Sequence, residues 1–159
     1  MDINTVNEEM SLAGALQLRA DIKTRIAQLH SRLNDNAKVQ EGETPAEDPL
    51  RLIGLLGAEC EAYETLIRRI NLTNAATVWE GKTLTALLAR RDALSLELSI
   101  FRDFLRQASQ RIDRYSKTEI KILSTVDVTA MQKTVDAKSK ELRQLDAAIQ
   151  KLNWTTTLI

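Results

Sequence analysis

Apolar side chains recur at alternating steps of three and four residues through residues 83–115, and this spacing restricts the fold more than any other feature of the sequence. It is the heptad pattern of helices that pack lengthwise against other helices. One charged residue interrupts the series. Its members are Leu84, Leu87, Arg91, Leu94, Leu98, Phe101, Leu105, Ala108 and Ile112. The segment therefore predicts a long helix with a narrow apolar seam.

Three other segments carry the same spacing. Charged residues make up 28% of the chain and aromatic residues only 4%, which favours long surface helices over a thick interior. We predict a mainly all-α fold: four long helices in an antiparallel, coiled-coil-like bundle, with short β segments in the inter-helix loops. Residues 1–9 form an N-terminal extension, and residues 10–159 form a single helical-bundle domain. The further seams are Leu12, Ala15, Arg19, Ile22, Ile26, Leu29 and Leu33; Ile53, Leu56, Cys60, Tyr63, Ile67 and Ile70; and Val128, Met131, Val135, Lys138, Leu142, Leu145, Ile149 and Leu152.

Cationic side chains interrupt three of the seams, at Arg19, Arg91 and Lys138. We expect each apolar stem to pack while its charge reaches a carboxylate such as Asp92 or Asp136. A buried ion pair that fixes helix register is the alternative.

The breaks between the helices contain turn residues and β-favouring residues. Asp48 followed by Pro49 predicts the start of the second helix, and the alternating run around Val39 predicts a short strand before it. Trp79 before Gly81 predicts a tight hairpin, with Thr83 capping the third helix. The third break has β-favouring residues around Ile122, and Asp127 could cap the last helix.

An up-and-down bundle would bring these breaks together in pairs. The Val39 segment would pair with the Ile122 segment at one end, and the Trp79 hairpin with the C-terminal tail at the other. The first end would gather polar side chains that could bind a small ligand, although satisfying loop backbone is a simpler use for them. These weak candidates are Asn34, Asn36, Gln40, Glu41, Arg114, Tyr115, Lys117 and Lys121. Secondary candidates, at the hairpin end, are Asn71, Asn74, Thr77, Arg90 and Asp92.

The composition argues against several classes of function. The 22 basic and 22 acidic residues balance, and no basic block stands out, so we expect no nucleic-acid partner. Cys60 and His30 are the only residues of their kinds; we expect Cys60 in the core and His30 on the surface, with no metal site, catalytic residue or cofactor. The N-terminus lacks a signal-peptide pattern, and no stretch is long and apolar enough to span a bilayer. These features predict a cytoplasmic protein without constitutive membrane insertion.

Several segments, including "NAKVQEGETPAEDP", "RINLTNAAT" and "RYSKTEIKILSTVDV", resemble the small bacterial septicolysin-like family. The resemblance covers the chain from about Leu12 to Trp154. It implies an all-helical protein that assembles into homo-oligomers, plausibly hexamers, with a start near Met10. The family's name implies a pore-forming cytolysin.

Apolar residues outside the narrow seams predict that the chain associates with itself. A four-helix monomer would not cover all of them, so identical chains would bury the remainder in a homo-oligomer, at least a dimer. An oligomeric structural or interaction scaffold is therefore the leading interpretation, and a ligand-binding protein or enzyme with a site at the polar end is the alternative. The residues concerned are Leu50, Leu52, Leu55, Leu66, Leu88, Leu96 and Phe104, together with Leu87, which also belongs to the seam of residues 83–115.

Overall fold

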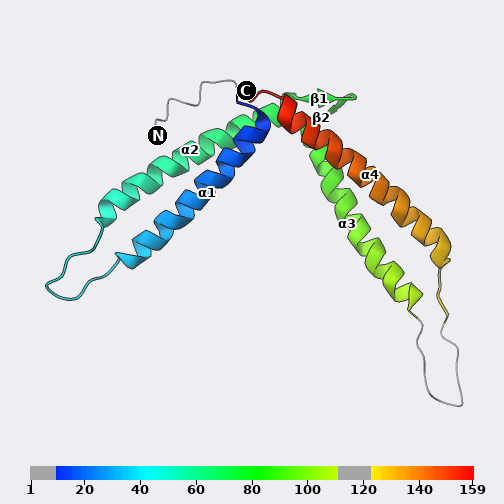
Figure 1. The fold of residues 1–159 in the computed structure, drawn as a ribbon, viewed down its shortest axis with the longest axis horizontal. Helices are drawn as coiled ribbons and strands as arrows, with labels where there is room; N and C mark the ends of the chain where they lie inside the picture. Colours follow the sequence, from blue (N-terminus) through cyan, green and yellow to red (C-terminus); the bar gives the residue numbers. More distant parts are fainter. Residues whose placement is uncertain (1–9, 111–122) are drawn as a thin grey trace, which may run out of the picture. The chain divides into compact units, whose positions relative to one another are not determined.

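The computed structural model describes residues 10–110 and 123–159. Within these residues the chain forms four helices and one two-stranded antiparallel sheet, which confirms the mainly helical fold (Figure 1). Two compact units divide the chain: Thr85–Gln150 forms one, and the chain up to Leu84 forms the other with Lys151–Ile159. The single domain over residues 10–159 stays a prediction. The elements are α1 (Leu12–Asp35), α2 (Pro49–Ala76), β1 (Val78–Trp79), β2 (Lys82–Thr83), α3 (Leu84–Ser109) and α4 (Val128–Thr155).

Helices α1 and α2 form an antiparallel hairpin in the first unit (Figure 1). The hydroxyl of Ser11 caps α1 by accepting a hydrogen bond from the Gly14 amide at 3.1 Å. Leu12, Ile22 and Leu29 are buried at the predicted heptad positions of α1. The predicted seam of the first helix is therefore confirmed.

The seam of α2 differs from the prediction. Ile53 is 54% exposed and Cys60 is exposed, so the expectation of a core cysteine is wrong. We call the face that packs toward the interior the inner seam of α2; its members are buried or half-buried and keep the steps of four and three. They are Leu52, Leu56, Glu59, Tyr63, Leu66, Ile70 and Thr73. The predicted set mixed this seam with a second one that lies on its outer side.

The turn-rich segment between α1 and α2 is a loop held in place by side-chain hydrogen bonds and an ion pair. Asn36 is 8% exposed, donates from its side-chain amide to the Arg32 carbonyl at 2.9 Å, and accepts from the Glu47 amide at 2.9 Å. A bidentate ion pair between Arg32 and Glu47 adds a second link. Asp48 then caps α2 as predicted, accepting from the Leu50 amide at 2.9 Å. The strand predicted around Val39 is wrong, because these local bonds hold the segment without a β ladder.

The predicted hairpin after α2 is confirmed. Glu80 and Gly81 both have positive φ, of 48° and 77°, as the two-residue turn of a twisted hairpin requires. The C-terminal tail, however, pairs elsewhere than predicted. Thr157 forms a β-bridge with Ser11 instead of joining the hairpin, flanked by hydrogen bonds of 2.8 Å from Leu12 N to Thr156 O and from Leu158 N to Met10 O. The tail thus binds the start of α1.

The second unit is the hairpin of α3 and α4. Its core contains Leu94, Leu98, Leu105 and Val135, with Phe101, Val128, Met131 and Leu142 packed against it. The seams predicted for both helices are therefore confirmed over the described residues; Ile112 lies outside them. Asp127 caps α4 as predicted, accepting from the Ala130 amide at 3.0 Å. The segment around Ile122 also lies outside the described residues.

Two of the seam cations reach carboxylates, as expected. Arg91 pairs with the neighbouring Asp92 at 2.7 Å. Lys138 pairs with Glu97 of α3 at 2.9 Å rather than with Asp136, and its ammonium lies 5.6 Å from the centre of the Phe101 ring. The pair with Glu97 joins α3 to α4 and helps to set their register. Arg19 is half-buried on α1.

Candidate functional site

The outer face of α2 carries a second heptad series, which we call the outer seam. Leu50 is 77% exposed and Ile53 54% exposed, and Ile67 is half-buried. Two further exposed leucines, Leu55 and Leu72, flank the series. A helix with one apolar face needs one packing partner, and for α2 that partner is α1. The outer seam is therefore apolar surface that the hairpin leaves uncovered. Its members are Leu50, Ile53, Gly57, Cys60, Glu64, Ile67 and Asn71.

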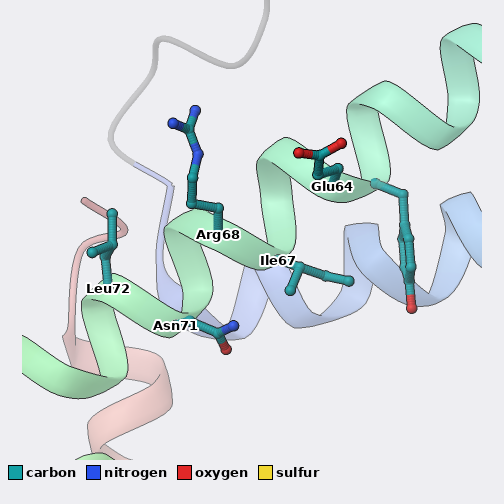
Figure 2. A pocket seen from close by; sticks show the side chains of 6 residues that line it. Glu64, Ile67, Arg68, Asn71 and Leu72 are labelled. Atoms are coloured by element: carbon teal, nitrogen blue, oxygen red, sulfur yellow. The ribbon is translucent and has the colours of Figure 1, made fainter.

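A depression lies toward the C-terminal end of the outer seam (Figure 2). Six side chains of α2 line it, and Figure 2 shows Glu64 and Arg68 projecting from the helix on the same side. Its volume is about 550 Å³. A hollow formed by one helix is shallow, and it is better suited to a packed side chain than to an enclosed small molecule. The lining residues are Tyr63, Glu64, Ile67, Arg68, Asn71 and Leu72.

Two glycines lie in the N-terminal half of the same face. A β-carbon at Gly54 or Gly57 would meet no atom of the described residues within 4 Å. Glycine inside a helix destabilises it by roughly 1 kcal/mol relative to alanine, because glycine loses more conformational freedom when the chain folds. Packing against residues 10–110 and 123–159 gives no reason for either glycine. A smooth helix surface does allow another backbone to approach closely.

The inner seam contains one carboxylate, Glu59. Its Oε1 accepts from the Arg25 Nε of α1 at 2.8 Å, whereas its Oε2 is buried and has no hydrogen-bond partner among the residues that the structure describes. The hydrogen bond to Glu59 raises the pKa of the Arg25 guanidinium. Because Arg25 belongs to α1 and Glu59 to α2, this pair joins the two helices and favours one register of the hairpin.

The polar-end candidates are only partly described by the structure. Asn34 contacts His30 at 3.2 Å on the exposed side of α1, so the surface position of His30 is confirmed. Asn36 is fully engaged in holding the loop, as already described, while Gln40 accepts a turn hydrogen bond from the Glu43 amide. Glu41 is exposed. Arg114, Tyr115, Lys117 and Lys121 lie outside the described residues, so the convergence of the whole set stays a prediction.

The secondary candidates separate into local roles. Asn71 lines the depression on α2, and Asn74 is half-buried three residues further along. Thr77 is the C-cap of α2 and donates its hydroxyl hydrogen to the Thr73 carbonyl. In the second unit Arg90 pairs with Glu141 at 2.6 Å, and Asp92 with Arg91.

Part of the apolar set predicted to join subunits is core instead. Leu52, Leu66 and Leu87 are buried. Leu88 is half-buried, and the remaining members are exposed. The apolar spacing did not predict Gly54, Gly57 and Glu64 of the outer face, because glycine and glutamate give no apolar signal. Their spacing from Leu50 and Ile53 was the one signal in the sequence that could have placed them on the outer face.

Within residues 10–110 and 123–159, no group of three or more histidine, cysteine, aspartate or glutamate side chains could hold a metal ion. Among the helices that the structure describes, none combines the length and the apolar character needed to cross a membrane.

The solved structures include one with close similarity. It is the crystal structure of a functionally unknown conserved protein from Corynebacterium diphtheriae, to which this chain is 43% identical with a TM-score of 0.83. The alignment covers 94% of this chain and 99% of that protein. No curated protein matches the sequence.

The same comparisons correct the resemblance proposed from the sequence. No septicolysin-like family is indicated, so that assignment is wrong, and the hexamer and the cytolytic activity inferred from it lose their basis. A family described only as being of unknown function, DUF6847, matches residues 19–158, nearly the whole length of this sequence. The chain therefore belongs to the DUF6847 family.

Proposed function

We propose that this protein is a self-associating helical interaction module, in which the outer seam of α2 packs against the outer seam of a second copy. The observation that carries the proposal is the exposed seam itself, with Leu50 and Ile53 more than half exposed. Burial of apolar surface is the main favourable term in protein association. An uncovered series of this length is unusual for a helix that needs no further partner.

A second copy fits this surface for a geometric reason. The seam runs over 22 residues, from Leu50 to Asn71, which is a helical length of about 33 Å. Its steps of three and four match those of an identical helix over the whole length. A two-fold contact is self-complementary and the commonest way in which identical chains associate. Every copy of the chain carries this seam, so the partner surface is present at the concentration of the protein itself.

The glycines give the pairing a definite register. An antiparallel two-fold contact over the full seam has its axis between Cys60 and Glu61. In that register Gly54 faces Ile67 of the second copy, so the isoleucine side chain enters the space that the glycine leaves open. The depression around Ile67 and Asn71 continues the same contact. The two ends of the seam then cover each other.

The test is the mass of the protein in solution. We expect light scattering after size exclusion, at micromolar concentration, to give at least twice the chain mass of 17.9 kDa. Ile53→Glu places a charge in the contact and should give the single-chain mass. The matched control is Val39→Glu, which replaces a similarly exposed apolar residue in the α1–α2 loop and should leave the mass unchanged.

Two results would refute the proposal. One is a wild-type mass of 17.9 kDa with no dependence on concentration. The other is an associated state that survives Ile53→Glu, because another surface would then hold the copies together. Circular dichroism of both variants verifies that they remain helical.

A further inference from the structure

A second cavity, which is open to solvent, lies on the surface of the α3–α4 hairpin and shares no residue with the outer seam of α2. Its volume is about 490 Å³. Leu105 of α3 and Val135 of α4, only 8% and 4% exposed, provide an apolar floor. Charged and polar side chains from both helices surround that floor. The cavity therefore combines an apolar base with a polar rim.

Three arginines dominate the rim. Arg102 and Arg106 lie one turn apart on α3, and Arg143 reaches the cavity from α4. Asp136 is the one carboxylate among the described lining residues, and it accepts a hydrogen bond from Gln132 at 2.9 Å. The described lining thus carries a net charge of +2, from three guanidinium groups and one carboxylate. This excess is local, since the chain as a whole is neutral.

The three guanidinium groups differ in how firmly they are held. Arg102 donates to the Ser139 hydroxyl across the hairpin at 2.9 Å, and that hydroxyl donates to the Val135 carbonyl at 2.7 Å. Arg106 pairs with Asp103 at 2.8 Å, but both side chains are about two-thirds exposed, and such surface pairs are weak. In the described part of the chain, Arg143 makes no hydrogen bond or ion pair. Arg102 is therefore held in position, whereas Arg106 and Arg143 are available to bind an anion.

We propose that this cavity binds a small organic anion, with a phosphate or carboxylate group on the arginines and a short apolar portion on Leu105 and Val135. Guanidinium groups donate two parallel hydrogen bonds to such oxyanions, and they keep their charge at every relevant pH. A bound anion would also relieve the repulsion among three cations around one cavity. The site does not depend on self-association through α2.

Phenyl phosphate is a suitable probe because it has both required parts. We expect saturable binding to the wild-type protein by calorimetry, weakened by added salt. Phenol lacks the anion and inorganic phosphate lacks the ring, so each should bind at least about tenfold more weakly, which corresponds to about 1.4 kcal/mol. Weaker binding of inorganic phosphate would show that the apolar floor contributes.

Variants locate the binding. Arg143→Gln and Arg106→Gln should each weaken phenyl phosphate binding by about tenfold or more, the loss of a charge-assisted hydrogen bond. Arg90→Gln is the matched control: it removes an arginine that bridges the same two helices outside the cavity, and it should leave the affinity unchanged. Circular dichroism checks that each variant is folded.

Three outcomes would overturn the proposal. The first is no saturable binding of phenyl phosphate to the wild-type protein. The second is an equal loss of affinity in Arg90→Gln and Arg143→Gln, which would indicate a general charge effect. The third is unchanged affinity in both cavity variants.

Discussion

Replacing Leu98 by alanine should destabilise the second unit by about 2–5 kcal/mol. Leu98 is 1% exposed in the core with Leu94, Leu105 and Val135. The change removes three carbon groups from that core, each contributing about 0.8 kcal/mol through its transfer from water. The cavity left behind adds a further cost where neighbours do not collapse into it. The matched control is Leu96→Ala, two residues earlier and 65% exposed, which should change stability by less than about 0.5 kcal/mol.

Urea denaturation followed by two probes measures this effect. Far-UV circular dichroism reports all four helices, whereas both tryptophans, Trp79 and Trp154, belong to the first unit. With a urea slope of about 2 kcal/mol per molar, the Leu98→Ala transition seen by circular dichroism should shift by about 1–2.5 M. A fluorescence midpoint that shifts equally would support the single domain predicted from the sequence. A fluorescence midpoint that stays in place would show that the two units unfold separately.

Either of two results would contradict the burial of Leu98 in the α3–α4 core. One is a Leu98→Ala protein as stable as the wild type by circular dichroism. The other is an equal loss of stability in Leu96→Ala, because the heptad seam would then not distinguish buried from exposed leucines.

Two further predictions concern the first unit. Thr73→Val removes a fully buried hydroxyl, which donates to the Arg69 carbonyl at 2.9 Å and accepts from the Ile159 amide at 3.0 Å. The Ile159 amide would then have lost its acceptor, which should destabilise the first unit by about 1–3 kcal/mol. An unchanged midpoint in tryptophan fluorescence would show that the tail does not depend on this bond. The hydrogen bond from Arg32 lowers the pKa of the Glu47 carboxyl below its usual 4.5, so the pair's contribution is present at neutral pH and is lost as pH falls through the lowered pKa. NMR titration should show that low midpoint and its rise in Arg32→Gln; identical midpoints in the two proteins would contradict the assignment.

The sequence predicted three of the four seams because their apolar residues keep one spacing and have no competitor. In α2 two apolar series overlap one helical position apart. Ile53, Cys60 and Ile67 belong to the outer series, and their steps of seven are as regular as those of Leu56, Tyr63 and Ile70. Periodicity alone cannot decide between them. The pair of Arg25 with Glu59 favours one face, but it depends on which residues of α1 and α2 lie side by side.

Local signals predicted caps and turns better than pairings. Asp48, Asp127 and the Glu80–Gly81 turn behave as their neighbouring residues indicate. The segment around Val39 has strand-like alternation, yet the bonds of Asn36 hold it as a loop. The cavity arginines were not predicted as a site. Arg143 is about 40 residues from Arg102 and Arg106 along the chain, and only the register of α3 against α4 brings it to them.

Cross-linking through Cys60 tests most directly whether the outer seam of α2 joins two copies. Cys60 is the only cysteine, it is exposed, and it lies next to the two-fold axis of the proposed contact. A short bifunctional maleimide should therefore convert the wild-type protein to a covalent dimer at micromolar concentration, and Ile53→Glu should prevent this. The central claim would be contradicted if a protein that is dimeric by light scattering gave no covalent dimer, or if Ile53→Glu cross-linked as efficiently as the wild type.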